Sequence, residues 1–175
     1  MKSILTDKQI AITIKRLAHQ IMENHTDVSN IAIIGLQPRG IYLSDRIYAE
    51  ITSLLKNKKI GYGKLDITFY RDDVRASLHK ANQTDIPFSI ENKEVVLIDD
   101  VLYTGRTTRA ALDALLDYGR PAKVELCVLI DRRFTRDFPI QADYVGKAID
   151  SFESQKVLVR WKENSDSDSV VITEG

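Results

Sequence analysis

Two adjacent acids, Asp99 and Asp100, directly follow the aliphatic run Val-Val-Leu-Ile at 95–98. Such a run fits a strand that is buried on both faces of a parallel sheet. Parallel sheets bind ligands at the carboxyl ends of their strands, and neighbouring strand residues point to opposite sides. The two carboxylates can therefore reach two different hydroxyls of one sugar, or one hydroxyl and a cation-bound group. A ribose offers that pattern.

The residues after the acids form a candidate phosphate site. Thr104 and Gly105 make a turn that opens an expected helix at 106–118. The free N–H groups of a helix N-terminus, its dipole and nearby threonine hydroxyls can converge on a phosphate. The implied ligand is a ribose phosphate. The candidate binding residues of this stretch are Asp99, Asp100, Val101, Tyr103, Thr104, Gly105, Arg106, Thr107 and Thr108.

Two other phosphate-binding motifs do not fit the sequence. The P-loop pattern G-x-x-x-x-G-K-[ST] does not occur, which argues against a nucleotide triphosphatase. In the dinucleotide pattern G-x-G-x-x-G, Gly61 and Gly63 are followed by Asp66 where the third glycine belongs, so nicotinamide binding is not expected. The plainer alternative is that the acids only end a strand and that Thr104-Gly105 is an ordinary turn.

A second loop of interest contains Pro38, Arg39 and Gly40 and also connects an expected buried strand to an expected helix. This connection places backbone donors and a cation at the same edge of the sheet as Asp99. The loop therefore suits a pyrophosphate, and Arg39 is a candidate for holding the charge of a leaving group. The alternative is a turn shaped by Pro38 and Gly40, with Arg39 in solvent.

The whole chain predicts an α/β fold. Strands and helices alternate after an amphipathic first helix that Thr6 or Asp7 can cap, a pattern typical of a mostly parallel central sheet flanked by helices. The expected elements are strand 31–36, helix 41–55, strand 65–70, polar stretch 71–89, strand 95–99, helix 106–118 and strand 124–130. The last third, with segments at 142–146, 156–161 and 170–173, departs from the alternation and predicts a small cap above the sheet.

Composition sets limits on the class of protein. A chain of 175 residues with 43% hydrophobic content is long enough for one globular domain with a single core. The 25 basic and 25 acidic residues cancel, so a nucleic-acid surface would have to be local. Cys127 lies in an apolar strand, where a buried inert thiol is expected. Because no signal peptide or membrane span is recognisable, we expect a cytoplasmic protein.

The string DDVLYTGRTTRAALDAL at 99–115 resembles the signature with which type I phosphoribosyltransferases bind 5-phosphoribosyl 1-diphosphate (PRPP). Within that superfamily the chain is similar to the PyrR family of pyrimidine operon attenuators and uracil phosphoribosyltransferases. The similar strings are PRGIYL at 38, DITFYRDD at 66, GRPAKVELCVLIDRR at 119 and ADYVGK at 142. The resemblance therefore extends over almost the whole chain and implies a type I phosphoribosyltransferase-like fold.

The resemblance implies that N1 of uracil displaces pyrophosphate from C1 of PRPP to give UMP. Mg²⁺ would arrive with PRPP, without a protein-only metal site. The implied catalytic residues are Asp99, Asp100, Arg39 and Arg71. The polar stretch of about 71–89 would close over PRPP as a lid and keep water from an oxocarbenium-like sugar. The alternative for Arg71 is a solvated position on a surface loop.

The resemblance places base recognition in a hood of about 132–175 within a single domain of 1–175. It assigns Arg132 and the backbone of Val157 to the base. The alternatives are that Arg132 pairs with acids such as Asp131 and that Val157 belongs to the core. A hypoxanthine or guanine phosphoribosyltransferase remains open, because the PRPP half of its site would look the same.

The family resemblance also implies an RNA partner. PyrR proteins bind a stem-loop of pyrimidine operon leader mRNA under the control of UMP, through a basic face of a dimer, so a homodimer or higher homo-oligomer is expected. The candidate RNA contacts are Arg16, His19, Arg136 and Lys147. Departures from the family pattern are Lys15, Pro38, Gln141 and one extra residue in DRRFTRDFPI at 131–140. An enzyme-only homologue without RNA binding therefore stays open.

Overall fold

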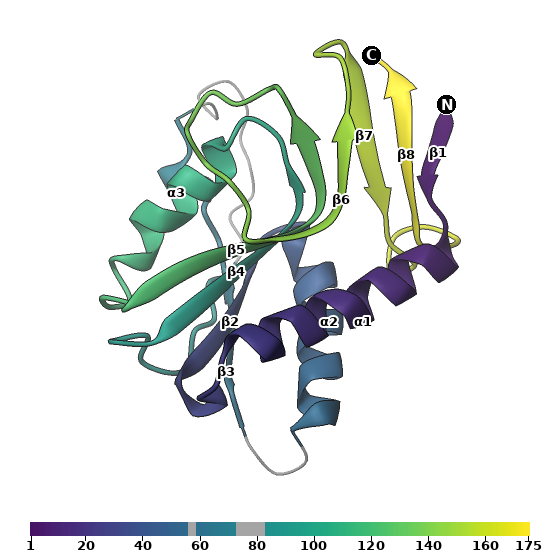
Figure 1. Ribbon diagram of the computed structural model, residues 1–175. Coiled ribbons are helices and arrows are strands. Elements are labelled where there is room, and N and C mark those ends of the chain that lie inside the picture. Colours follow the sequence, from purple (N-terminus) through teal and green to yellow (C-terminus); the bar gives the residue numbers. More distant parts are fainter. Residues whose placement is uncertain (56–58, 73–82) are drawn as a thin grey trace.

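The computed structural model describes residues 1–55, 59–72 and 83–175 (Figure 1). The central sheet has five strands in the order β3-β2-β4-β5-β6, and every neighbouring pair in it is parallel. Its strands are β2 (Ile31–Leu36), β3 (Gly61–Leu65), β4 (Glu94–Leu102), β5 (Lys123–Arg133) and β6 (Tyr144–Asp150). The helices are α1 (Asp7–Asn24), α2 (Gly40–Leu54) and α3 (Arg106–Leu115), with short 3-10 helices η1 (Val28–Asn30) and η2 (Thr68–Tyr70). The expected parallel α/β sheet is confirmed.

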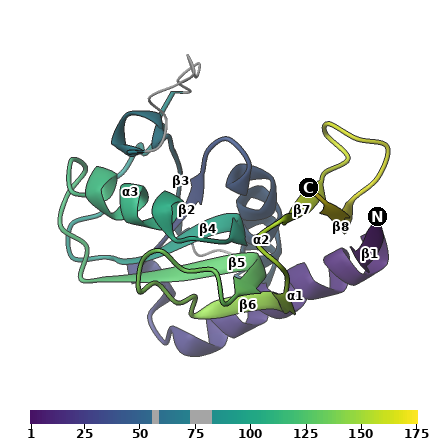
Figure 2. The ribbon, with the colours of Figure 1, turned by 90° about the horizontal axis from the view of Figure 1, so that it is seen from above.

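Helices cover both faces of this sheet. Ile33 and Ile98 belong to an apolar cluster with residues of α1 and α2, whereas Ile34 and Leu97 belong to a second cluster with residues of α3. The alternation follows from the strand geometry, because successive side chains point to opposite faces. Seen from above, α3 lies on one side of the sheet and α1 on the other (Figure 2). The central strands are therefore buried on both sides and present only their ends to ligands.

The first helix begins where the sequence predicts. Thr6 Oγ1 accepts a hydrogen bond from the Gln9 N–H at 3.4 Å, and Gln9 Oε1 accepts one from the Thr6 N–H at 2.9 Å. This reciprocal capping box satisfies two N–H groups that the start of a helix leaves without partners. Ile10 and Leu17 are fully buried, so the apolar stripe of α1 packs on the sheet as its helical spacing indicates.

The predicted strand at 65–70 is wrong in position. The strand ends at Leu65, and Thr68–Tyr70 form η2. Asp66 ends it, because Asp66 Oδ1 accepts hydrogen bonds from the Thr68 N–H at 3.1 Å and hydroxyl at 2.7 Å and turns the chain. The strand instead begins at Gly61, where a Cβ would meet the Phe88 ring at 2.8 Å. Close packing therefore explains a strand residue that local propensity disfavours.

The cap is a three-stranded antiparallel sheet in the order β1-β8-β7, formed by β1 (Lys2–Leu5), β7 (Gln155–Arg160) and β8 (Ser169–Glu174). The chain termini consequently lie side by side at one corner (Figure 1). The sequence prediction missed β1 and wrongly assigned 142–146 to the cap. Those residues overlap β6, which pairs with β5 in parallel. No helix separates β5 from β6, so the alternation of strands and helices gave no signal for this strand.

The polar stretch 71–89 is described only in part, since 73–82 lie outside the described residues. Residues 83–85 of this stretch are attached to the sheet edge and the loop beside it. Lys64 and Asp85 form an isolated bridge, Thr84 Oγ1 accepts a hydrogen bond from the Asp66 N–H at 3.0 Å, and Gln37 Nε2 donates to the Gln83 carbonyl at 2.7 Å.

None of the described helices has the length and apolarity that a membrane crossing requires.

Candidate active site at the carboxyl ends of the parallel strands

Two loops and one strand end meet at the carboxyl edge of the sheet. The loop before α2 lies tightly against β4, because a Cβ on Gly40 would lie 2.5 Å from the Ile98 carbonyl oxygen and 2.9 Å from Asp99 Cα. Only glycine permits this approach. The Gln37-Pro38 peptide bond in the same loop is cis. This packing brings Arg39 next to the two acids, as the sequence predicts.

Asp99 and Asp100 are both buried, with 9% and 6% of their surface exposed. Asp99 Oδ1 accepts a hydrogen bond from the Asp100 N–H at 2.8 Å. Asp100 Oδ2 forms an ion pair with Arg39 Nε at 3.0 Å, and among the described residues it accepts no hydrogen bond. The acids therefore keep acceptor capacity for a ligand at the end of β4.

The electrostatics of this pair are unfavourable for two full charges. Burial raises the pKa of Asp99 well above its usual range, the neighbouring Asp100 raises it further, and Arg39 partly opposes both effects. Burial also raises the pKa of Asp100, while Arg39 lowers it. Desolvation and like-charge repulsion both disfavour the ionised form of a carboxyl group. A hydroxyl donor or a cation that enters the site would stabilise the ionised pair.

Arg39 connects the two sheets across the site. Its side chain is 49% exposed, yet Nη2 donates a hydrogen bond to the Val159 carbonyl of β7 at 3.1 Å while Nε pairs with Asp100. Arg39 is therefore held by two contacts while about half of its side chain remains in solvent. The guanidinium lies where it can exchange Asp100 for a more highly charged ligand.

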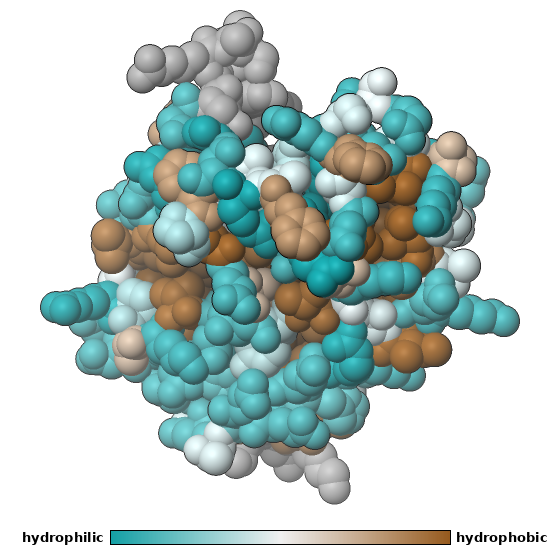
Figure 3. Space-filling view, turned by 45° about the horizontal axis from the view of Figure 1, so that its top comes forward, coloured by the Kyte–Doolittle hydropathy of each residue, from teal (hydrophilic) through white to brown (hydrophobic). Residues whose placement is uncertain are grey.

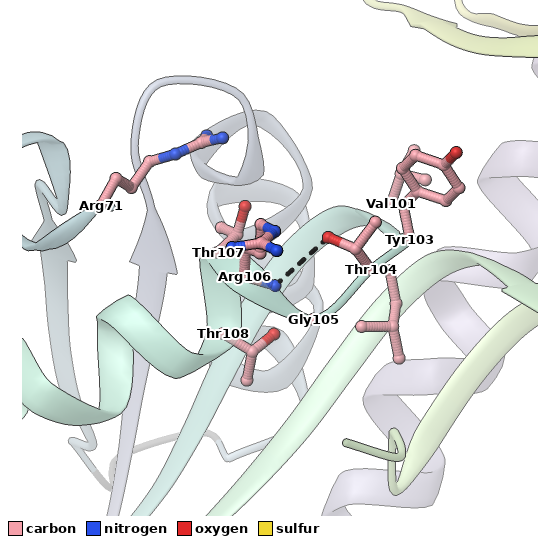
Figure 4. Close-up of a pocket in the computed structure, with 9 residues that line it drawn as sticks. Arg71, Val101, Tyr103, Thr104, Gly105, Arg106, Thr107 and Thr108 are labelled. Carbon is pink, nitrogen blue, oxygen red and sulfur yellow. Dashed lines mark hydrogen bonds between the residues drawn. The ribbon is translucent and has the colours of Figure 1, made fainter. Parts of the chain in front are cut away.

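The loop between β4 and α3 surrounds a cavity of 290 Å³ that is lined by Arg71 and by residues 101–108 (Figure 4). Gly105 has a φ of 89°, in the left-handed region that a side chain disfavours, and it immediately precedes α3. Thr104 Oγ1 accepts a hydrogen bond from the Arg106 N–H at 3.5 Å. The start of α3 and Thr107 thus line one cavity, where N–H groups at the helix N-terminus can bind a phosphate.

Arg106 and Arg71 approach this cavity from different segments. Arg106 Nε pairs with Asp137 at 2.9 Å and its Nη1 pairs with Asp72 at 3.2 Å, and these hydrogen bonds raise the pKa of Arg106. Arg71 reaches from its own segment toward the side of the loop that carries Thr107 (Figure 4). Asp72 therefore connects the start of the polar stretch to the loop.

Comparison with known proteins decides the family. The family model described as the phosphoribosyl transferase domain matches residues 1–164. The chain is 45% identical to the bifunctional protein PyrR of Chloroflexus aurantiacus, over 99% of this chain and 96% of the relative. It is also 45% identical to the bifunctional protein PyrR of Deinococcus deserti, over 96% of this chain and 92% of the relative. The chain belongs to the PyrR family of phosphoribosyltransferases.

Solved structures agree with the PyrR assignment at the level of fold. A hypoxanthine phosphoribosyltransferase of Trypanosoma cruzi superposes with a TM-score of 0.75 at 20% identity, covering 99% of this chain and 95% of that one. A hypoxanthine phosphoribosyltransferase of Staphylococcus aureus gives a TM-score of 0.68 at 24% identity, covering 88% and 79%. The fold is therefore that of the type I phosphoribosyltransferases.

The two residues that the resemblance assigned to the base lie in different surroundings. Arg132 is buried, and its guanidinium donates to Ser151 Oγ and to the Phe152 and Gln155 carbonyls at 2.9–3.1 Å. It also lies 3.8 Å from the centroid of the Tyr103 ring. Arg132 therefore holds the β6–β7 connection beside the PRPP signature. Val157 lies on β7, partly buried against the core cluster of α1 and α2.

The candidate RNA contacts divide into two groups. Arg16 donates to the Gly146 carbonyl at 2.6 Å and Lys147 donates to the Ile4 carbonyl at 3.1 Å, so both lie where α1 meets β6. Exposed His19 follows Arg16 on α1 by three residues. Arg136 lies outside this edge, because its guanidinium faces the carbonyls of the PRPP loop. The structure brings three of the four candidates together.

Sequence reasoning missed several residues that shape the site. Asp72 and Asp137 pair with Arg106, and Val159 supplies the carbonyl that holds Arg39. These contacts join segments that are far apart in the chain, so no local spacing indicates them. The strand-end face that Figure 3 brings forward carries many hydrophilic side chains, as a site for polar ligands requires.

Proposed function

We propose that the protein transfers the 5-phosphoribosyl group of PRPP to N1 of uracil, giving UMP and pyrophosphate. The observation that carries the proposal is the position of Asp99 and Asp100 between two anion-suited loops, the Gly40 loop on one side and the Gly105 loop on the other. This arrangement suits a ligand with a phosphate at one end, a diol in the middle and a pyrophosphate at the other. The PyrR relatives support uracil as the acceptor.

Each part of PRPP has an expected contact. The 5′-phosphate accepts hydrogen bonds from the loop at 104–108, including the first N–H groups of α3. The ribose hydroxyls donate to Asp99 and Asp100, which lie in the carboxyl-terminal part of β4. The pyrophosphate lies toward Arg39 and the Gly40 loop. Residues 38–40 and 99–108 therefore form the proposed PRPP site.

The reaction itself requires little covalent chemistry from the protein. The C1–O bond to pyrophosphate breaks with its electron pair leaving on oxygen, and a cationic sugar develops. Uracil N1 then bonds to C1 while the N1 proton passes to solvent. The negative carboxylates beside the ribose stabilise that cation, and Arg39 stabilises the departing charge. Positioning of both substrates accounts for the rest. In this scheme Arg39 exchanges its partner Asp100 for the pyrophosphate.

The acids also fit a divalent cation that enters with PRPP. Buried Asp100 Oδ2 lacks a hydrogen bond among the described residues, and carboxylate oxygens are the donors that Mg²⁺ prefers. When bound, Mg²⁺ would supply positive charge to the pyrophosphate that leaves. Asp99 and Asp100 would be the residues beside this cation, and they would also orient the ribose hydroxyls.

Arg71 is proposed to act with the polar stretch 71–89 over bound PRPP. Its guanidinium already lines the cavity beside Thr107. We expect Arg71→Ala to lower turnover with uracil far more than it lowers PRPP binding, because closure excludes water from the cationic sugar. Steady-state kinetics and calorimetric PRPP titration check this. Equal losses in turnover and binding would contradict the lid role.

The base is proposed to lie beside the hood of about 132–175. Arg132 would shape its wall by fixing the Ser151 to Gln155 connection next to Tyr103. The backbone of Val157 on β7 would read the pyrimidine edge. This part of the site distinguishes uracil from a purine.

The direct test is to incubate the protein with PRPP, Mg²⁺ and each of uracil, hypoxanthine, guanine, adenine and orotate, and to measure the nucleotide and pyrophosphate formed. UMP from uracil alone is the expected result. Turnover with a purine alone would move the protein to the purine phosphoribosyltransferases. Failure with all five bases would overturn the proposed activity.

A second function is RNA-dependent regulation of pyrimidine operon transcription under the control of UMP. Arg16, His19 and Lys147 gather where α1 meets β6, which provides the local basic surface that a neutral chain needs. We propose that a cytoplasmic homodimer or higher homo-oligomer presents this surface to leader mRNA. The word bifunctional in the names of the PyrR relatives supports it.

Lys147→Ala tests the RNA surface, since this residue is exposed and its side chain makes a single hydrogen bond within the described residues, to the Ile4 carbonyl. We expect weaker binding of a pyrimidine-leader hairpin and a salt slope reduced by about one. Lys156→Ala, on the exposed side of β7, is the matched control. If the wild-type protein shows no submicromolar hairpin binding at low salt with UMP, the protein is an enzyme only.

A further inference from the structure

The guanidinium of Arg136 is held by main-chain oxygens around the PRPP signature. Nη1 donates to the Tyr103 carbonyl at 2.5 Å and to the Arg132 carbonyl at 2.7 Å, Nε donates to the Ile140 carbonyl at 3.0 Å, and Nη2 pairs with Asp131. Only 22% of the side chain is exposed. A cation with this many internal acceptors has few donors left for an external phosphate.

The residues after Arg136 bind the same loop through their backbone. The N–H groups of Asp137 and Phe138 both donate to the Thr104 carbonyl, at 2.9 and 3.2 Å. Arg136 donates to the carbonyl of Tyr103, the residue before Thr104. Two consecutive carbonyls of the loop are therefore directed toward the segment 136–140. Because these oxygens face the segment 136–140, the backbone N–H groups of the loop are the polar groups that remain for an anion in the cavity.

Side chains of this segment hold the start of α3. Asp137 pairs with Arg106 Nε at 2.9 Å, and the Phe138 ring lies 5.4 Å from the Arg106 guanidinium. A Cβ on Gly105 would lie 3.3 Å from Ile140, so this residue packs directly behind the glycine. The segment therefore contacts the loop through carbonyls, an ion pair and apolar packing.

We propose that residues 136–140 brace the phosphate-binding loop and that Arg136 is its central positioning residue, acting on the 5′-phosphate site and not on RNA. This inference rests on the proposed function, because it gives the loop at 104–108 the 5′-phosphate of PRPP as its ligand. The brace fixes the loop before the ligand arrives, so binding costs less ordering of the chain. Arg39, at the pyrophosphate end of the site, contacts Asp100 and Val159 and, within the described part of the chain, forms no hydrogen bond or ion pair with residues 136–140, so pyrophosphate should bind independently.

Isothermal titration calorimetry with two probes separates local bracing from general damage. In Arg136→Ala we expect the Kd for ribose 5-phosphate to rise about tenfold or more, the loss that one charge-assisted hydrogen-bond network typically causes. The Kd for inorganic pyrophosphate with Mg²⁺ should change less than about twofold. Arg133→Ala is the matched control, because this neighbouring arginine is 51% exposed and pairs with Asp150 outside the loop.

Asp137→Asn is a second variant for the case in which Arg136→Ala fails to fold. It removes the exposed ion pair with Arg106 but keeps the backbone hydrogen bonds. It should raise the Kd for ribose 5-phosphate by a smaller factor than Arg136→Ala does and leave the Kd for pyrophosphate unchanged. Hydrogen exchange at the amides of 105–107 should also become faster in either variant.

Several results would overturn the brace. Unchanged binding of ribose 5-phosphate by both folded variants would do so, and so would an equal loss of affinity for ribose 5-phosphate and for pyrophosphate. So would a loss of hairpin RNA binding in Arg136→Ala with ribose 5-phosphate binding intact. If the wild-type protein binds ribose 5-phosphate but forms no UMP, the proposed enzymatic function fails while the brace remains testable by the same titrations.

Discussion

Replacing Asp99 with asparagine should stabilise the fold while it removes activity. The amide oxygen of asparagine can keep the hydrogen bond from the Asp100 N–H, which is 2.8 Å long. The substitution removes a buried charge whose neighbouring cation, Arg39, pairs with Asp100. Relief of one poorly compensated buried charge is worth about 1–3 kcal/mol. For a chain of this size we therefore expect a melting temperature higher by roughly 2–4 °C per kcal/mol.

The pH dependence identifies the cause of that gain. Because burial raises the pKa of Asp99, the folded protein binds more protons than the unfolded chain between the two pKa values. Wild-type stability therefore falls as pH rises through that window. Below the unfolded pKa, about 3.9, Asp99 is protonated in both states and the advantage of the asparagine variant should vanish. The gain should be largest at neutral and alkaline pH.

Thermal and urea unfolding of wild type and Asp99→Asn between pH 4 and 8 would measure this effect. Asp150→Asn is the control, because this acid is 61% exposed and should change stability by less than about 0.5 kcal/mol. Lower stability of Asp99→Asn at neutral pH, or a gain that does not depend on pH, would refute the reasoning. PRPP-dependent turnover should be lost in Asp99→Asn and kept in Asp150→Asn.

Three further predictions concern other parts of the molecule. Arg39→Ala should weaken the binding of Mg²⁺-pyrophosphate by about tenfold or more in calorimetry, since it removes a cation from the proposed leaving-group site; unchanged binding would exclude that role. Gly105→Ala should destabilise the fold by about 1–2 kcal/mol in urea, because its φ of 89° disfavours a side chain, and a neutral effect would contradict this reason. His25 Nε2 lies 3.1 Å from a Glu94 oxygen and 3.0 Å from a Glu125 oxygen at the other end of the strands, so His25→Ala should destabilise the fold by about 1–3 kcal/mol through the loss of buried polar contacts, without a change in KM for PRPP. A raised KM would show that this cluster acts on the site.

Local signals in the sequence were sufficient for the centre of the sheet and for the PRPP signature. The aliphatic runs of β2 and β4 are buried on both faces, as their composition predicts. The acids lie in the carboxyl-terminal part of β4 and the Gly105 turn follows this strand directly, so their joint position needs no long-range information. Cys127 is buried and free, as expected for a thiol inside an apolar strand.

Features that depend on distant contacts could not be found in this way. Strand β1 exists because Lys2 and Ser3 pair with residues of β8 at the opposite end of the chain. Strand β6 follows an irregular connection that carries no helix pattern. The hydrogen bond of Arg39 to the Val159 carbonyl and the brace around Arg136 likewise join segments that the sequence separates. Their residue types are ordinary, and only the packing gives them a role.

The most direct test combines Asp99→Asn with Asp100→Asn and measures UMP formation from PRPP and uracil against the wild-type protein. We expect the wild type to form UMP and the double variant to form none, while calorimetry and circular dichroism show that the variant remains folded. UMP formation by the folded double variant at the wild-type rate would contradict the assignment of these acids to the ribose.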